Sequence, residues 1–376
     1  MKLSAVAHFR DMPNDPETVC LSGKSGSERR AVKVTRLTQP GPYVRFSSKI
    51  YALFRLMVYG FQPVLFAARR YLFLTSPPSQ SSALHAAAWT LGAIVPWATM
   101  AAAIDAALKM VPSSQLLFWS FVFATPAAFL WDRLLGGRPA ITLFRIELPV
   151  LLIGLLGIFG WTAGVQLSLD RAPVIEANLL TYLWPLLMVA MSPLAGERFS
   201  AVSLFGVVVG FVGAALITTG GKGVVIEPGF YVGYSLALFG AVAWAMFVIL
   251  LQRQGSHATG RTPVFVAAGC VCAFAMAFGI DGKISIPPPM AILAAAWLGI
   301  GPMSLAFVCW DRAVTSNHLA LVGRLSYFDP LISTLLLMIF MGLLPTLEAW
   351  IGMILIILGV ALPEIWTVRS HRAASK

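Results

Sequence analysis

The segment LDRAPVIEANLLTYLWPLL (169–187) decides the fold, because two of its motifs occur a second time in the chain. The second copy is WDRAVTSNHLALVGRLSYFDPLI (310–332), where WDRA matches LDRA and SYFDPLI matches TYLWPLL. LGAIVPW (91–97) resembles FGAVAW (239–244) in the same way, and the offsets of the three pairs lie between 141 and 148 residues. Residues 84–220 and 229–368 are therefore predicted to be two copies of one unit.

Composition assigns this unit to a membrane. The chain of 376 residues is 58% hydrophobic and only 11% charged, too few charges for a water-facing surface. Apolar runs of about 20 residues recur, each long enough to cross a bilayer core of about 30 Å. They lack the period-two alternation of barrel strands, so the fold class is all-α and polytopic. Ten spans are predicted, at about 84–108, 114–134, 148–168, 174–195, 200–219, 229–251, 263–280, 290–311, 318–341 and 347–368.

Five spans in each copy give the second copy the opposite orientation in the bilayer. Such inverted five-helix repeats suit alternating access around a central site. Loops on one side carry most of the arginines, whereas the other side has only Lys109, Arg171, Lys222 and Lys283. The positive-inside rule then places both termini on the cytoplasmic side of a bacterial inner membrane.

The remaining segments are short or basic. Residues 1–48 are predicted to be a disordered basic extension, 49–82 an interfacial amphipathic helix with a linker, and 369–376 a cytoplasmic tail. The net charge of +11 is concentrated in the N-terminal part. We interpret it as favouring anionic lipid and topology, and we expect no nucleic-acid partner.

The order of motifs in residues 172–217 resembles the EamA-type drug/metabolite transporter superfamily. The features that carry the resemblance are a span rich in small residues, the proline Pro185 within it, the turn Gly196-Glu197-Arg198 and a glycine-rich helix. Within the superfamily, PWATM around Trp97, TYLWP, GAVAWA around Trp244 and LSYFDP are most similar to the YddG-type aromatic amino acid exporters. The resemblance implies a secondary transporter that exports aromatic or other neutral amino acids and related metabolites, with a small-molecule substrate and no enzymatic activity.

Aromatic residues near span centres are the candidate cavity lining, because flat rings with one polar atom suit an aromatic or aliphatic ligand. The alternative for them is ordinary helix packing or an interfacial aromatic belt. The candidate set, with one hydroxyl included, is Trp97, Trp161, Tyr182, Trp184, Trp244, Trp310, Ser326 and Tyr327.

Prolines and charges inside spans form a second group of candidates. Pro185 and Pro330 each remove a helical hydrogen bond, so each is expected to kink its helix, with a hinge role left open. Glu176 and Asn178 begin the fourth span; the carboxyl of Glu176 either contacts substrate or a proton, or pairs with Arg171.

Arg324 and Asp329 depart from the pattern of the resembling exporters. Five residues apart on one helix, the two side chains lie off each other's face, so each is expected to need another partner. Alternatively, they face each other across a cavity and bind the carboxylate and the ammonium of a zwitterion.

The chain lacks the sequence motifs that several other functional classes require. TTGGKGV (218–224) has glycine where a P-loop needs a hydroxyl after Lys222, and the chain has no zinc-protease or nucleophile-elbow motif. Cys20, Cys270, Cys272 and Cys309 show no metal-binding spacing, so neither metal nor cofactor is expected. The glycines Gly206, Gly210 and Gly213 predict close helix packing, with a homodimer contact as one use. Carriers of drugs, other metabolites or nucleotide sugars, and a membrane protein without transport, remain alternatives.

Overall fold

The computed structural model describes most of the chain downstream of residue 82. The described ranges are 83–135, 146–196, 200–223, 227–254, 260–316, 318–341 and 346–374. The predicted basic extension (1–48) and interfacial segment (49–82) lie outside them. Within these ranges all regular structure is helical, as the composition predicts.

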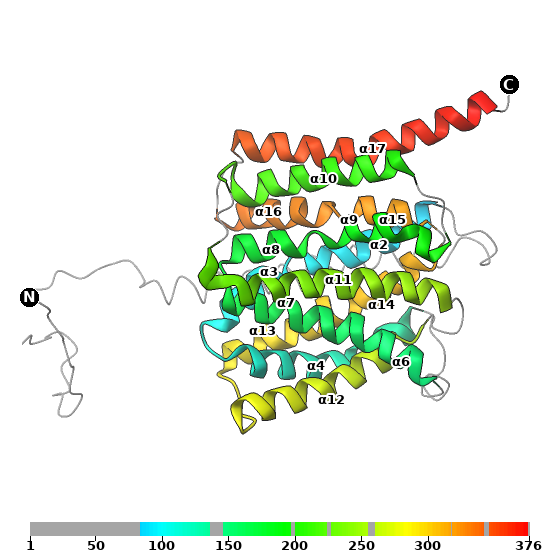
Figure 1. The fold of residues 1–376 in the computed structure, drawn as a ribbon. Coiled ribbons are helices and arrows are strands. Elements are labelled where there is room, and N and C mark those ends of the chain that lie inside the picture. Colours follow the sequence, from blue (N-terminus) through cyan, green and yellow to red (C-terminus); the bar gives the residue numbers. More distant parts are fainter. Residues whose placement is uncertain are drawn as a thin grey trace, which may run out of the picture. The chain divides into compact units, whose positions relative to one another are not determined.

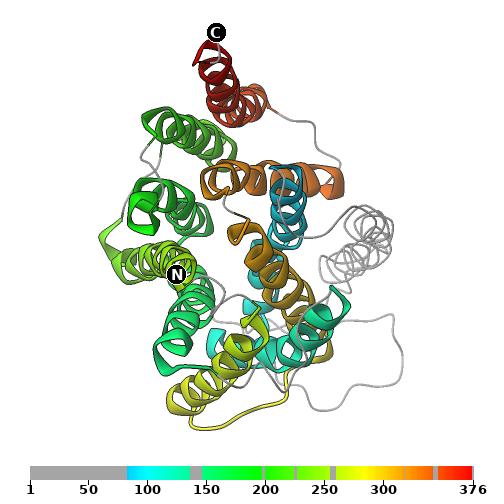
Figure 2. The ribbon, with the colours of Figure 1, turned by 90° about the vertical axis from the view of Figure 1, so that its right-hand side faces the viewer.

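The helices lie nearly side by side along one direction (Figure 1) and form a bundle when viewed along that direction (Figure 2). Some spans are continuous and others are made of shorter pieces. The helices are α2 (Ala83–Trp97), α3 (Met100–Leu108), α4 (Ser113–Leu134), α6 (Leu148–Gly154), α7 (Trp161–Arg171), α8 (Val174–Thr181), α9 (Trp184–Met191), α10 (Ala201–Thr219), α11 (Tyr231–Gln254), α12 (Thr262–Asp281), α13 (Pro289–Ile300), α14 (Ala306–Val314), α15 (Leu319–Leu325), α16 (Phe328–Met341) and α17 (Leu347–Ala374). The short η elements are η1 (Leu155–Gly160) and η5 (Gly301–Leu305), which are π-helical, and η2 (Ser192–Ala195) and η3 (Pro228–Phe230), which are 3₁₀.

Among the described residues, eight helical stretches are long and apolar enough to cross a membrane. They match the first eight predicted spans. The ninth predicted span is divided into α15 and α16 by a break at Ser326-Tyr327. The apolar part of the tenth, Leu347–Pro363, is shorter than the other spans.

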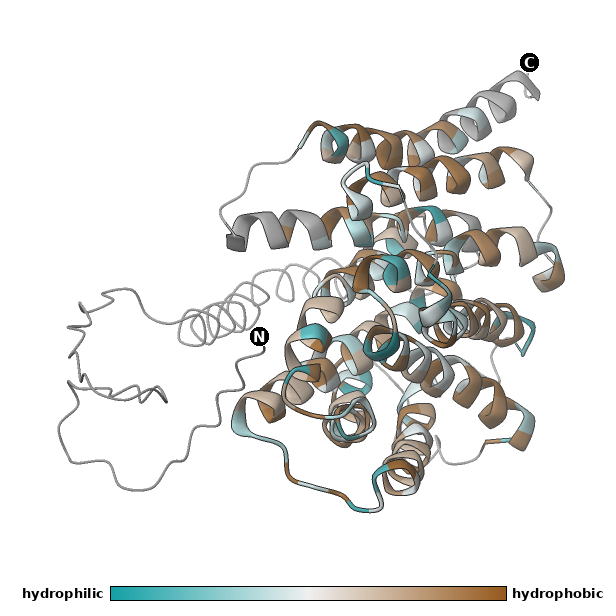
Figure 3. Cartoon of the chain, turned by 60° about the vertical axis from the view of Figure 1, so that its left-hand side comes forward, coloured by the Kyte–Doolittle hydropathy of each residue, from teal (hydrophilic) through white to brown (hydrophobic). Residues whose placement is uncertain are grey.

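Hydrophobic residues dominate the helices of the bundle (Figure 3), and the eight long apolar helices indicate an integral membrane protein. Large side chains such as Phe205, Val271 and Ile354 are more than half exposed. Polar residues such as Thr90, Ser120 and Gln166 are instead completely or almost completely buried. A water-soluble protein rarely exposes contiguous apolar surface on this scale, whereas a lipid-facing surface requires it.

Glycines bring α10 and α17 into close contact at one edge of the bundle (Figure 1). A Cβ atom added to Gly213 would lie 2.6 Å from the carbonyl oxygen of Gly352, and one added to Gly352 would lie 2.6 Å from that of Gly213. Gly206 and Gly359 approach each other in the same way. The glycine surface predicted for close packing is therefore used inside the chain, so it is not free for the homodimer contact suggested for it.

Gly213→Leu should destabilise the protein, because the new side chain cannot fit against the backbone of α17. Overpacking typically costs about 1–3 kcal/mol, which should appear as a lower melting temperature in detergent. Gly279→Leu is the matched control, since no atom lies within 4 Å of a Cβ added at Gly279 in α12. Equal melting temperatures for the two variants would contradict the close α10–α17 contact.

One end of the bundle is held together by two aspartates that contact the start of α4. We call it the Ser113 end. Ser113 Oγ donates to Asp170 Oδ2 at 2.8 Å, and Ser114 Oγ and Gln115 Nε2 both donate to Asp281 Oδ2, the latter at 2.7 Å. Asp170 lies in the last turn of α7 and Asp281 ends α12, so the contacts connect both helices to α4.

The opposite end, which we call the Arg312 end, has a corresponding pair of aspartates. The backbone N–H of Gly260, just before α12, donates to Asp311 Oδ2 at 2.7 Å. Arg312 Nη2 donates to Asp132 Oδ1 at 3.2 Å, and the guanidinium lies over the ring of Trp89, 5.4 Å from its centroid. Asp311 is the repeat counterpart of Asp170, because the two stand in WDRA and LDRA. Each of the two therefore binds the start of the second helix in its own copy.

Candidate substrate cavity

Three interrupted helices meet near the middle of the bundle. α2 gives way to α3 at Ala98-Thr99, α8 to α9 at Tyr182-Leu183, and α15 to α16 at Ser326-Tyr327. A proline lies close to each break: Pro96 lies in the last turn of α2, and Pro185 and Pro330 lie in the first turns of α9 and α16. Proline lacks an N–H, so it fits the first turn of a helix, whereas in a helix interior it removes a hydrogen bond. The predicted disruption thus occurs at both repeat-related prolines, as full breaks.

A cluster of five tryptophans fills the space beside these breaks. Its members come from five different helices and are Trp97, Trp161, Trp184, Trp244 and Trp310. Trp184 lies edge-on to Trp310 with ring centroids 5.1 Å apart, and Trp97 lies edge-on to Trp244 at 5.5 Å. Trp97 is fixed further by its Nε1–H, which donates to the carbonyl oxygen of Pro302 at 3.0 Å. Edge-to-face contacts of this kind stabilise aromatic packing beyond the area they bury.

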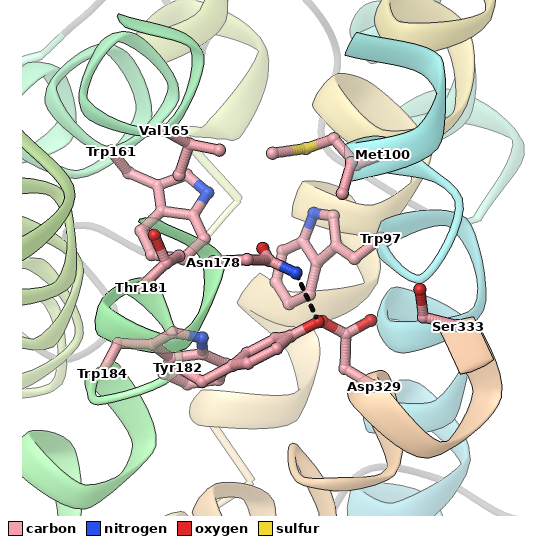
Figure 4. Close-up of a pocket in the computed structure, with 11 residues that line it drawn as sticks. Trp97, Met100, Trp161, Val165, Asn178, Thr181, Tyr182, Trp184, Asp329 and Ser333 are labelled. Carbon is pink, nitrogen blue, oxygen red and sulfur yellow. Dashed lines mark hydrogen bonds between the residues drawn. The ribbon is translucent and has the colours of Figure 1, made fainter. Parts of the chain in front are cut away.

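Part of this cluster borders a cavity (Figure 4). Its lining comes from the α2–α3 break, α7, the α8–α9 break and the first turns of α16. The lining residues are Trp97, Met100, Ala101, Trp161, Val165, Asn178, Thr181, Tyr182, Trp184, Asp329 and Ser333. The cavity therefore has aromatic and apolar walls with a few polar groups, which is the usual composition of a small-molecule site.

The polar groups gather on one side of the cavity. Asn178 Nδ2 donates to Tyr182 Oη at 3.3 Å, one turn further along the chain. The carboxyl group of Asp329 lies beside the Tyr182 hydroxyl (Figure 4), and its Oδ1 atom is buried without a hydrogen-bond partner among the described residues. Trp161 Nε1 is likewise buried without an acceptor there. A donor and an acceptor are thus both available beside the cavity.

Six of the predicted site residues line this cavity: Trp97, Trp161, Asn178, Tyr182, Trp184 and Asp329. Trp244 and Trp310 belong to the tryptophan cluster, each 1% exposed, but are not among the lining residues. Their rings support the lining tryptophans from behind.

The other predicted residues lie elsewhere. The Ser326 hydroxyl donates to the carbonyl oxygen of Val322 in its own helix, and the Tyr327 ring packs against Gly210 of α10. Arg324 Nη1 donates to Ser203 Oγ of α10 at 2.8 Å, so Arg324 does not face Asp329 across the cavity. Glu176 is half-buried in α8, and Arg171 forms its ion pair with Asp170, at 3.6 Å.

Sequence reasoning missed five lining residues: Met100, Ala101, Val165, Thr181 and Ser333. All five lie three or four positions after a predicted residue, which is one helical turn. Met100 and Ala101 follow Trp97, and the other three, Val165, Thr181 and Ser333, follow Trp161, Asn178 and Asp329. Helical periodicity applied to the predicted residues would have found them.

The cavity is small, about 30 Å³, which is space for about one or two water molecules. An aromatic amino acid does not fit without movement of side chains or helices. The three breaks adjoin the lining residues, so relative movement of the helix pieces would change the cavity directly.

The chain belongs to the EamA-like transporter family, whose model matches it twice, at residues 84–219 and 231–363. It is therefore a transmembrane transporter of the EamA type. Similar curated proteins include the aromatic amino acid exporter YddG of Ancylobacter novellus, which is 31% identical over 66% of this chain and 85% of the exporter.

More distant relatives and one solved structure agree with that assignment. The uncharacterized transporter YvbV of Bacillus subtilis is 25% identical over 57% of this chain and 71% of the relative. The probable terminal-alkyne amino-acid exporter of Streptantibioticus cattleyicolor is also 25% identical, over 61% and 77%. A crystal structure matches with a TM-score of 0.65 at 29% identity, covering 74% of this chain and 96% of the other.

Proposed function

We propose that the protein is a secondary exporter of aromatic or other neutral amino acids and related metabolites across a bacterial inner membrane. The observation that carries the proposal is the cavity lined by Trp97, Trp161, Tyr182 and Trp184 where interrupted helices meet. Aromatic rings favour flat apolar side chains, and polar groups at one side of the cavity can contact an amino acid backbone. Two similar proteins, the exporter YddG and the probable terminal-alkyne amino-acid exporter, support the same substrate class.

The architecture we propose is ten transmembrane helices in two inverted five-helix repeats. The double family match supports two copies. The contacts of Asp170 with Ser113 and of Asp311 with Gly260 support the inversion, because these repeat-related contacts lie at opposite ends of the bundle. In this scheme α15–α16 and α17 are the ninth and tenth spans.

The Arg312 end is the cytoplasmic one in this proposal. α2 begins there, and α17 ends on the same side (Figure 1). Arg133, Arg253 and Arg261 also lie at that end of their helices or just beyond it. An excess of basic residues marks the cytoplasmic side of membrane proteins.

Transport would proceed by alternating access. The two repeats would exchange inward-open and outward-open arrangements, with movement at the breaks before Pro185 and Pro330. The aspartate contacts at the two ends hold α4, α7, α12 and α14 together, so these helices would move as a unit against the interrupted ones.

Uptake into proteoliposomes tests the substrate class. Purified protein should catalyse flux of labelled phenylalanine, tyrosine or tryptophan above protein-free vesicles, and flux of labelled glutamate should stay at background. Measuring each flux with and without a pH gradient reports whether transport is coupled to protons. Background flux for every neutral amino acid, with transport of a drug or nucleotide sugar instead, would assign the protein to another branch of the family.

A further inference from the structure

Asp329 occupies the place that the first repeat gives to a cavity tryptophan. In the matched motifs TYLWP and SYFDP, Trp184 aligns with Asp329, and both residues lie in the first turn of the helix that follows a break. Both also line the cavity. The two repeats therefore contribute different chemistry at equivalent positions, with an indole from one copy and a carboxyl group from the other.

The carboxyl group of Asp329 has no positive partner in this cavity. The described lining contains no Lys, Arg or His. The nearest basic residue in the sequence, Arg324, contacts Ser203 of α10. Oδ1 of Asp329 is buried and accepts no hydrogen bond from the described residues. A carboxylate placed in such surroundings is stabilised by a cation that enters with a ligand.

The rest of the lining also favours a positively charged ligand. The rings of Trp97, Trp161, Tyr182 and Trp184 line the same cavity as the carboxyl group (Figure 4), and the faces of aromatic rings attract cations. A ligand carboxylate would meet only neutral donors, such as the Asn178 amide, together with the like charge of Asp329. The cavity thus favours a positively charged ligand group, and its described lining has no basic side chain that would bind a negatively charged one.

We propose that Asp329 is the specificity-determining residue that binds a protonated amine, so that the protein accepts aromatic or apolar amines whether or not they carry a carboxylate. The inference rests on the proposed transport function and narrows its substrate class. The ammonium group donates to Asp329 Oδ1, and the apolar body lies against the tryptophans. The amine is the required group of the ligand and the carboxylate is dispensable.

Three ligands with the same ring separate the contribution of the amine from that of the carboxylate: phenylalanine, 2-phenylethylamine and 3-phenylpropionate. Binding to the full-length protein in detergent is measured by calorimetry, which needs no transport. We expect phenylalanine and 2-phenylethylamine to bind within about ten-fold of each other and 3-phenylpropionate to bind at least about ten-fold more weakly, since a charge-assisted hydrogen bond contributes at this level. Equal or tighter binding of 3-phenylpropionate would overturn the proposal.

The variant Asp329→Asn tests the residue itself, because it keeps the shape and removes the charge. We expect it to weaken 2-phenylethylamine binding by about ten- to hundred-fold and to abolish the preference over 3-phenylpropionate, while Asp329→Glu retains the preference. Asp105→Asn is the matched control, since Asp105 forms an exposed pair with Lys109 in α3 and does not line the cavity. An unchanged amine preference in a folded Asp329→Asn protein would refute the assignment.

The results distinguish this inference from the proposed function. Amine-selective binding without flux in vesicles would leave the amine site standing and remove the transport assignment. Amino acid flux that is the same in wild type and Asp329→Asn would leave the transport assignment and remove the amine site. If Asp329→Asn does not fold, the comparison of the three ligands on the wild-type protein still decides the proposal.

Discussion

Trp184→Ala should lower the transport of aromatic amino acids by about ten-fold or more, mainly by raising the half-saturating concentration. The indole lines the cavity and touches Trp97, Trp161 and Trp310, with ring centroids 6.4, 6.2 and 5.1 Å away. Its removal takes away a wall that contacts substrate, and losing the burial of one large apolar group costs about 1.5–3 kcal/mol. Initial uptake rates in proteoliposomes over a range of substrate concentrations measure the effect.

Two further variants make this experiment specific. Trp350→Ala removes an indole that is 54% exposed on α17, away from the cavity, and should leave the half-saturating concentration unchanged. Trp184→Phe keeps an aromatic face and should recover most of the lost affinity. Normal transport by a folded Trp184→Ala protein would show that the substrate does not contact this wall.

Arg312→Ala should destabilise the fold by about 3–5 kcal/mol, the usual cost of removing one member of a buried ion pair. The Arg312 side chain is 17% exposed and that of Asp132 only 3%. The substitution also removes the hydrogen bonds to the carbonyl oxygens of Val308 and Leu135 and the contact with the Trp89 ring. A lower melting temperature in detergent is the measurement.

The contrast is with an exposed ion pair on α3. Lys109 and Asp105 are 2.7 Å apart but 56% and 43% exposed, so Lys109→Ala should cost less than about 1 kcal/mol. Similar melting temperatures for Arg312→Ala and Lys109→Ala would mean that the contacts at the Arg312 end do not hold the bundle together.

Much of the fold could be predicted from sequence because a membrane span is recognised by the length of its apolar run. A helix in lipid needs about 20 apolar residues and satisfies its own backbone hydrogen bonds. The predicted span 114–134 accordingly agrees with Ser113–Leu134. The breaks before Pro185 and Pro330 follow equally directly from the missing N–H of proline.

The cavity was less predictable because the direction of a side chain depends on packing between distant helices. Trp97 and Trp244 are both central tryptophans, yet only Trp97 lines the cavity, while Trp244 packs against Phe307 and Phe247. The five-residue spacing of Arg324 and Asp329 indicated different faces, but it did not reveal the break between them or that Arg324 would contact Ser203 of α10. The LDRA and WDRA motifs could be recognised in the sequence as a repeat. That their aspartates, Asp170 and Asp311, hydrogen-bond to the start of another helix is known only from the structure.

The central claim is that an aromatic amino acid occupies the tryptophan-lined cavity during transport. Substrate protection of a cysteine at Ser333 tests it most directly, in a protein whose native cysteines are replaced. The account predicts that phenylalanine or tryptophan slows the labelling of the Ser333→Cys thiol at concentrations that saturate transport, whereas glutamate does not. Labelling at an unchanged rate while the same protein transports phenylalanine would contradict the account.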